Sequence, residues 1–401
     1  MQQTIAVQGK TRFLRNALVL GLLTAIGPFA IDMYLPSMPS IGASLGADAD
    51  RVLLSLTAFF VTFALGHMLF GPVSDMVGRK APLYFGILLF AGASIGCALA
   101  TDIETLIGFR ALQGLGGAAG IVISRAIVRD LHSGVDEARL LALLMLVLSV
   151  SPLFAPLIGS IIIEQTSWRS VFWLVLAAAL IGFVLAIVFV RETRPAHLRG
   201  DSNWAGVLAG CKFLLTDRQF LGLTFIGSFA LSSFFVFLAQ SSFVLMDRYG
   251  LSPMAYSLVF SVNAAAFFAA MQFNGWLGAR FGLRRLVRPA VYGYAAAMLL
   301  LLALVLVGVE NLLLLEVVLF AGYAFVGILL PVSSVLALED HGTIAGTASS
   351  LMGTLQLACG AIAMALSGAF ADGNLLPMVA GIAGCAAMSL LLALILLKPR
   401  D

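Results

Sequence analysis

Long apolar runs follow one another along almost the whole chain, separated by short polar segments. Each run has roughly the twenty residues that an α-helix needs to cross the hydrocarbon of a bilayer. Since no alternating strand pattern of the barrel type is present, the runs predict an all-helical integral membrane protein. The twelve predicted spans are 14–36, 51–72, 81–100, 103–127, 137–163, 168–190, 219–241, 253–278, 286–308, 311–334, 342–370 and 375–397.

The longest polar segment, 191–218, lies midway along the chain. Its charges argue against a further span, and its 204–215 portion has the pattern of a short amphipathic helix on a membrane surface. We therefore predict an N-terminal six-helix half at 1–190, a linker at 191–218 and a C-terminal six-helix half at 219–401.

Two similar turns support this duplication. Residues 71–80 read Gly-Pro-Val-Ser-Asp-Met-Val-Gly-Arg-Lys between the second and third predicted spans. Residues 275–285 keep the glycines and a basic pair but have Ala279 at the aspartate position. A turn repeated at equivalent places is typical of two related halves, and we expect its glycines to form the bend.

The positive charges orient the predicted spans. Of the 23 Lys and Arg residues, all but Arg51, Arg110, Arg169 and Arg248 lie at the N-terminus, in alternate loops or at the C-terminus. By the positive-inside rule, both termini and the linker are predicted to be cytoplasmic.

Composition excludes several classes of function. With 61% hydrophobic and 11% charged residues, the chain differs from soluble domains. Its net charge of +3 is dispersed, which argues against nucleic-acid binding. Neither the four cysteines nor the four histidines have metal-site spacing, and no phosphate-binding GxxxxGK[ST] loop is present. We therefore expect no cofactor, no metal and no enzymatic activity.

Four motifs resemble the major facilitator superfamily, and the resemblance covers essentially the whole chain. Residues 71–80 look like its loop signature, and 31–39 (IDMYLPSMP) is similar to the first-helix motif of drug:proton antiporters. Residues 110–118 match the fourth-helix motif, and 151–160 resemble the fifth-helix antiporter signature, with Ala155 and Ser160 where glycine is frequent. The combination looks most like the Bcr/CflA branch of multidrug efflux pumps.

The resemblance implies a function. Members of that branch export bicyclomycin, chloramphenicol-type or sulfonamide drugs in exchange for protons. It therefore implies a monomeric transporter of the bacterial inner membrane that exports drug-like or amphiphilic small molecules by alternating access, driven by the proton gradient. Three alternatives stay open: a proton-coupled importer, a metabolite exporter on the same fold, and a non-transporting membrane receptor.

Asp32 and Arg110 are the candidate proton-coupling pair. An acid inside a membrane span is expensive unless it faces water or binds a proton. Residue counts place Arg110 at a similar depth, where a guanidinium would favour the ionised carboxylate and burial the protonated one. The alternative is a structural ion pair between the first and fourth helices.

The signature turn is a candidate conformational switch, formed by Gly71, Asp75, Gly78, Arg79 and Arg129. The family precedent places this loop against the start of the eleventh helix, around 341–347, where a carboxylate gains from the helix dipole. Arg129 is the expected ion-pair partner of Asp75. The alternative is a topological anchor without a switching role.

Two further groups of residues and one acid, Glu316, are candidates. Pro152, Pro156 and Gly159 should kink the fifth helix and allow a neighbour to approach closely. Glu316 is either a second protonatable group or an interfacial side chain. Polar residues that could line the substrate cavity are Tyr34, Gln113, Ser233, Gln240, Asn263 and Gln356.

Overall fold

The chain is all-helical in a computed structural model that describes residues 2–199, 204–371 and 373–396. The helices that form membrane spans are α1 (Gln2–Asp32) with η1 (Leu35–Ser37) and α2 (Met38–Leu45), α3 (Ala49–Val77), α4 (Lys80–Leu99), α5 (Ile103–Leu131), α6 (Gly134–Gln165), α7 (Arg169–Phe189), α10 (Arg218–Ser242) with η2 (Phe243–Arg248), α11 (Pro253–Gln272), α13 (Leu283–Leu306), α14 (Leu312–Leu338), α15 (Ala345–Gly368) and α16 (Leu375–Leu396). The remaining elements are α8 (Ala196–Arg199), α9 (Trp204–Leu214), α12 (Asn274–Phe281) and η3 (Gly342–Ile344).

Twelve segments of the described residues are long and apolar enough to cross a membrane, which confirms the predicted number. Their outer surfaces are apolar as well. On α7, for example, Ile181, Val184 and Val188 are 56%, 57% and 63% exposed. Such a surface suits hydrocarbon rather than water, and the chain is a multi-pass membrane protein.

The first span is not one continuous helix. α1 ends at Asp32, a 3₁₀ turn contains Pro36, and α2 follows with Pro39 in its first turn. Proline cannot donate a backbone hydrogen bond, so it is tolerated at such helix starts. Asp32 therefore occupies the last position of α1, next to an interruption of the helix.

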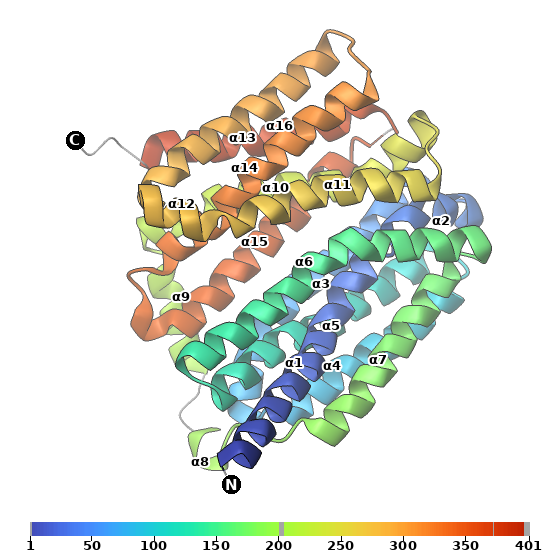
Figure 1. Cartoon of the computed structure of the whole chain (residues 1–401). Helices are drawn as coiled ribbons and strands as arrows, with labels where there is room; N and C mark the ends of the chain where they lie inside the picture. Colours follow the sequence, from blue (N-terminus) through green and yellow to red (C-terminus); the bar gives the residue numbers. More distant parts are fainter. Residues whose placement is uncertain (1, 200–203, 372, 397–401) are drawn as a thin grey trace.

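Figure 1 shows the helices from blue to green, α1 to α7, gathered on one side of the molecule, and those from yellow to red, α10 to α16, on the other. The two sets meet where α3 lies beside α15 and where α6 lies beside α11. An even number of spans separates the start of α1 from the end of α16, so both lie on one face. We call this face the terminal face and the opposite one the far face.

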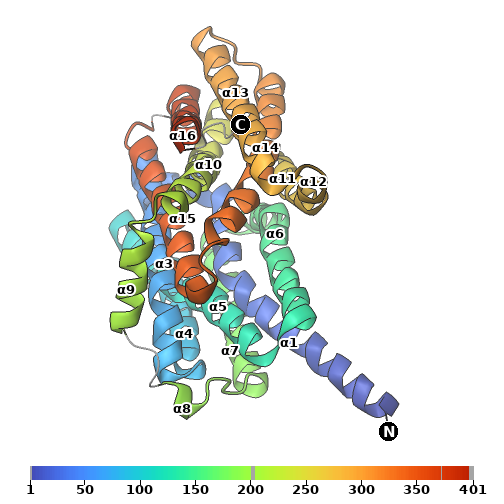
Figure 2. The ribbon, with the colours of Figure 1, turned by 90° about the vertical axis from the view of Figure 1, so that its left-hand side faces the viewer.

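The linker contains the predicted surface helix. α9 covers Trp204–Leu214, buries Cys211 and Leu214, and leaves Trp204 and Leu208 exposed. Figure 2 shows it at the outside of the bundle, and it packs against α15. The predicted helix in this segment is present, and its position on a membrane surface stays a prediction.

Glycines of α5 allow its neighbours to approach closely. A Cβ atom on Gly114 would lie 2.2 Å from the carbonyl oxygen of Phe59 in α3, and one on Gly116 would lie 2.6 Å from the backbone of α4 at Gly86 and Phe90. Only glycine fits at such helix contacts. The fourth-helix motif thus packs α5 between α3 and α4, which places Arg110 in the interior.

The bend of the signature turn lies later than predicted. α3 continues through Gly71 and Pro72 to Val77, and the chain reverses at Gly78, where φ is +100°. The second turn bends at Gly282, where φ is +81°. In each turn the later glycine, Gly78 or Gly282, therefore supplies the positive φ that the bend requires. The earlier glycine of the first turn, Gly71, packs near Val122 and Ser350.

Candidate functional site

Asp32 is buried between helices, with 3% of its surface exposed. Its Oδ2 atom accepts a 2.7 Å hydrogen bond from Oγ of Ser151, which lies on α6 and is fully buried. No cation pairs with this carboxylate in the part of the chain that the structure describes. An acid so placed is costly in its charged form, which favours binding of a proton or of a cationic group.

Arg110 has different neighbours. Its Nη1 donates to Oε1 of Gln113 at 2.6 Å, and Nε2 of Gln113 donates to Oγ of Ser94 at 2.8 Å. The guanidinium carbon lies 4.5 Å from the ring centre of Tyr34 and 4.3 Å from that of Phe59. Two aromatic faces therefore stabilise a cation that no carboxylate neutralises within the described residues.

The expected pairing of Asp32 with Arg110 is not formed. Asp32 binds α6 through Ser151, whereas Arg110 binds α5 and α4 through Gln113 and Ser94. The interpretation as a structural ion pair is wrong for this conformation, because the two side chains bond to different neighbouring helices. Asp32 and Arg110 each stay a candidate for proton coupling, now as separate residues and not as a pair.

The predicted cavity residues are buried or half-buried, but within the described residues no hydrogen bond joins one of them to another. Tyr34 bonds to Ser55, Ser233 to the Ala230 carbonyl, and Gln356 weakly to Ser334 at 3.4 Å. Instead, Tyr34 and Gln113 share Arg110 as a neighbour. Nε2 of Gln240 is buried without a partner in the described residues.

Glu316 has a hydrogen-bond partner on the neighbouring helix. Nδ2 of the buried Asn263 donates to its Oε2 at 2.5 Å, which links α11 to α14. Glu316 is half-buried about one turn into α14, so both interpretations, a second protonatable group and an interfacial side chain, stay predictions.

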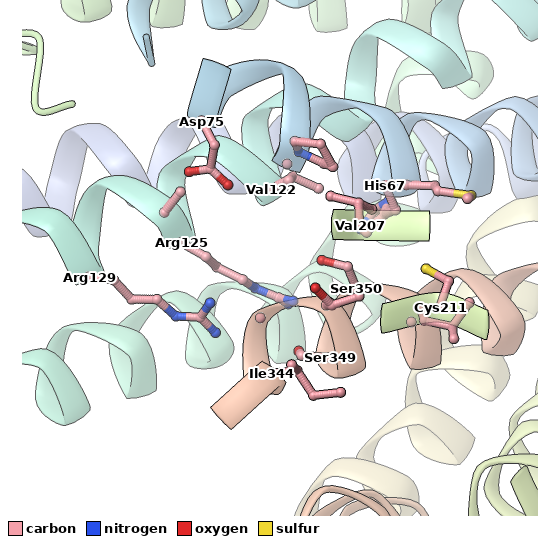
Figure 3. A pocket seen from close by; sticks show the side chains of 18 of the residues that line it. His67, Asp75, Val122, Arg125, Arg129, Val207, Cys211, Ile344, Ser349 and Ser350 are labelled. Carbon is pink, nitrogen blue, oxygen red and sulfur yellow. The ribbon is translucent and has the colours of Figure 1, made fainter. Parts of the chain in front are cut away.

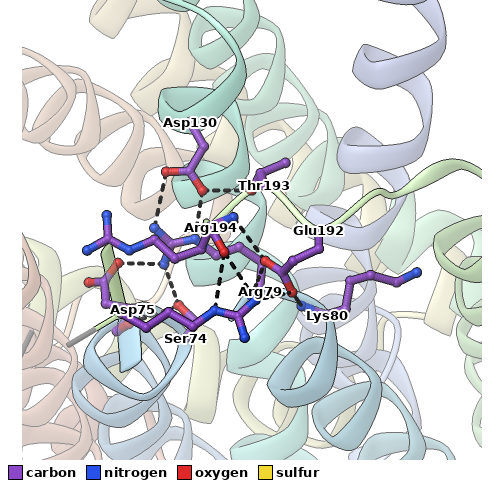
Figure 4. Close-up of polar contacts among 10 residues, drawn as sticks. Ser74, Asp75, Arg79, Lys80, Asp130, Glu192, Thr193 and Arg194 are labelled. Carbon is purple, nitrogen blue, oxygen red and sulfur yellow. Dashed lines mark hydrogen bonds and ion pairs between the residues drawn. The ribbon is translucent and has the colours of Figure 1, made fainter. Parts of the chain in front are cut away.

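Arg79 is the centre of the signature turn. Its Nε and Nη2 donate to the two carboxylate oxygens of Asp130 at 2.8 and 3.2 Å, while Nη1 contacts Asp75 at 2.7 Å and Ser74 at 2.7 Å. Figure 4 shows these contacts, which connect the bend to the end of α5. The expected pair of Asp75 with Arg129 is wrong, since Arg79 is the partner of Asp75.

The linker adds a further layer. Oε1 and Oε2 of Glu192 accept from the backbone N–H groups of Arg79 and Lys80 at 2.9 and 3.2 Å, and Arg194 N–H also donates to Oε1 (Figure 4). Burial raises the pKa of Glu192, but these donors and Arg199 outweigh it and hold the pKa below its ordinary value. Sequence reasoning missed Asp130 and Glu192. The sequence did contain a signal for them, because Asp130 stands at the end of the fourth span and Glu192 just after the sixth.

A cavity of about 470 Å³ opens beside this turn, and we call it the vestibule. Its walls come from α3, α5, α9 and the start of α15, and they include Asp75, Arg125, Arg129 and Ser350. Figure 3 shows Arg125 directed toward Ser350 and Ser349, with Arg129 one turn further along the same helix. All the predicted switch residues except Gly78 thus line this cavity, together with the start of α15.

The antiporter-type segment of α6 forms the contact near the far face. A Cβ on Gly159 would lie 2.5 Å from the carbonyl oxygen of Met33, so the end of α1 packs directly against α6. Ser160 and Ser257 share a 2.5 Å hydrogen bond, and Ser257 donates to the Pro156 carbonyl at 3.0 Å. Pro152, Pro156 and Gly159 therefore lie where α6 meets both α1 and α11.

The profile of the Major Facilitator Superfamily matches residues 20–364. The chain belongs to this superfamily. An uncharacterized MFS-type transporter, YdgK, of Bacillus subtilis (strain 168) is 36% identical over 90% of both chains. The bicyclomycin resistance protein homolog of Haemophilus influenzae is 28% identical over 93% of this chain and 94% of its own length.

Solved structures of the superfamily share the fold. The crystal structure of a D-xylose-proton symporter superposes with a TM-score of 0.74 at 16% identity, covering 96% of this chain and 97% of that one. The predicted resemblance to drug-resistance proteins of the Bcr/CflA type is confirmed, because the relatives also include chloramphenicol and multidrug resistance proteins. As a superfamily member, the chain is a membrane transporter of small molecules and not an enzyme.

Proposed function

We propose that this transporter exports drug-like or amphiphilic small molecules across the bacterial inner membrane in exchange for protons. The observation that carries the proposal is Asp32, a buried acid in a membrane span with a serine as its hydrogen-bond partner and no cation among the described residues. The names of several relatives, which refer to antibiotic and multidrug resistance, support the choice of substrate class.

Asp32 is placed where a proton can affect the helices. Its partner Ser151 lies on α6, and the same helix contacts α11 through Ser160 and Ser257. Binding of a proton removes the charge that Ser151 stabilises, so it changes the interaction between α1 and α6. Because α6 also forms the contact with the C-terminal helices, this change biases the equilibrium between two arrangements of the helix sets.

The proposed cycle uses two half-units, 1–190 and 219–401, connected by the linker 191–218. Substrate occupies the space between them and the halves rock around it. The terminal face, with most of the cations, is cytoplasmic in this proposal, and one chain acts alone. The vestibule on this face provides access to the space between α3, α5 and α15.

Transport in proteoliposomes tests the exchange. With a pH-sensitive dye inside, a gradient of chloramphenicol or bicyclomycin should drive protons in the opposite direction, and the Asp32→Asn variant should lose at least about 90% of this signal, since the amide cannot carry a proton. Asp136→Asn, an exposed acid on the terminal face, is the matched control and should behave like the unsubstituted chain.

The sign of the proton movement separates the alternatives. Protons that move with the substrate indicate an importer-type symporter. Full coupling in Asp32→Asn would contradict the assigned role of Asp32. A drug-susceptibility panel in a pump-deleted host, comparing the same variants, extends the test to living cells, where a receptor without transport activity would give no resistance.

A further inference from the structure

Two guanidinium groups in the vestibule have no partner among the described residues. Arg125 and Arg129 are four residues apart on α5, and both line the cavity. Within the described residues, neither side chain takes part in an ion pair or a hydrogen bond. Nε of Arg125 is covered completely without an acceptor. Leaving this buried donor of Arg125 unsatisfied costs free energy, which favours a bound acceptor, while Arg129 adds a second, exposed positive charge.

The acids of the vestibule are already engaged. Asp75 and Asp130 both contact Arg79, so they are not available to Arg125 and Arg129. The cavity wall thus contains three arginines and two aspartates, an excess of one positive charge. His67 also lines the wall, and no other acid does so among the described residues. Like charges one turn apart repel, and an anion between them would relieve this repulsion.

The opposite wall is the start of α15. This helix begins at Ala345, and Ile344 at its N-cap position offers no side-chain acceptor for the first backbone N–H groups. Thr347, Ser349 and Ser350 of its first turns line the same cavity. The start of a helix carries partial positive charge, which suits an anion. Figure 3 shows the Arg125 guanidinium next to Ser349 and Ser350.

We propose that the vestibule binds an anionic phosphate group between Arg125, Arg129 and the start of α15. The volume of about 470 Å³ exceeds that of one phosphate, so the group can carry an organic part. It is either the headgroup of an anionic lipid or a soluble phosphate compound. Because α5 and α15 belong to different helix sets, the bound anion connects the sets on the terminal face. This inference is independent of proton coupling and of transport direction.

Binding to the purified full-length protein tests the proposal. The probes are radiolabelled inorganic phosphate in a scintillation proximity assay, and phosphatidylglycerol or phosphatidylcholine in mixed micelles as competitors. We expect saturable phosphate binding that Arg125→Gln and Arg129→Gln each weaken at least about tenfold, as expected for charge-assisted hydrogen bonds. The control is Arg285→Gln, which changes an exposed arginine on the same face that does not line the vestibule, and it should bind like the unsubstituted chain.

The competitors identify the source of the phosphate group. Displacement by phosphatidylglycerol and not by phosphatidylcholine indicates a lipid headgroup, and phosphate binding without lipid competition indicates a soluble ligand. Both outcomes support the site. Equal binding by all three variants, or no binding of either probe to the unsubstituted protein, overturns it. Gel filtration and the melting temperature verify folding, and Arg129→Gln, at an exposed position, serves if Arg125→Gln does not fold.

Discussion

The two equivalent turns make the same connection with different chemistry. In the N-terminal set, Arg79 at the start of α4 bonds to Asp130 at the end of α5. In the C-terminal set, Arg284 at the start of α13 bonds to Glu339 just after α14. Each ion pair joins the third span of its set to the end of the fourth, which is the expected result of a duplicated unit.

The surroundings distinguish the pairs. Arg79 is 4% exposed and bonds to both oxygens of Asp130, to Asp75 and to Ser74. The side chains of Arg284 and Glu339 are 66% and 50% exposed and make one contact of 3.1 Å. A buried guanidinium needs its acceptors to offset the free energy lost when it leaves water, so losing them is destabilising. An exposed guanidinium that loses its partner bonds to water instead, at little cost in stability. Ala279, in place of an aspartate, also removes one acceptor from the second turn.

Removing the two arginines should have the most unequal effects. Arg79→Ala leaves Asp130 and Asp75 without their cation, and we expect a loss of ~2–3 kcal/mol of stability. Arg284→Ala should change stability by less than ~0.5 kcal/mol, because its pair is exposed. Melting temperatures of the two purified variants in the same detergent measure the difference. Equal shifts in melting temperature would show that the burial of Arg79 does not make its turn more important for stability than the turn of Arg284.

Alanine at the two bends should differ less. Gly78 and Gly282 both have φ values that side chains adopt with strain of ~1–3 kcal/mol. A Cβ on Gly78 would also lie 2.7 Å from Oε2 of Glu192, whereas one on Gly282 meets open space. We expect Gly78→Ala to lower the melting temperature more than Gly282→Ala. The opposite order would mean that the linker contact is dispensable.

The smallest expected effect concerns pH. The folded protein holds the pKa of Glu192 below its ordinary value of about 4.3. The contribution of Glu192 to stability is therefore complete above the pKa that Glu192 has in the unfolded chain. It is lost as the pH falls through the lower pKa of the folded protein. The difference in melting temperature between the unsubstituted chain and Glu192→Gln should shrink from pH 7 to pH 3. A difference that stays constant would contradict this contribution.

The sequence by itself determined the number of spans and most of their limits. A helix satisfies its own backbone hydrogen bonds, so its length and apolar composition suffice to predict it in a membrane. The same holds for the amphipathic α9 and for the glycine at each bend. Some helix ends were displaced. α3 ends at Val77 and not at 72, the seventh span continues through η2 to Arg248 and not to 241, and α11 ends at Gln272 and not at 278. Proline and glycine limit a helix without setting its last residue.

The tertiary structure decided which side chains meet. Ser151 is 119 residues from Asp32, and Glu192 is 113 residues from Arg79. Contacts over such separations depend on which faces of the helices turn toward each other, and span composition carries little information about this because lipid and protein interior are both apolar. The sequence therefore identified Asp32, Arg110 and Asp75 as unusual residues in a membrane protein. Helix packing decided that Asp32 and Arg110 bond to different helices and that Asp75 pairs with Arg79.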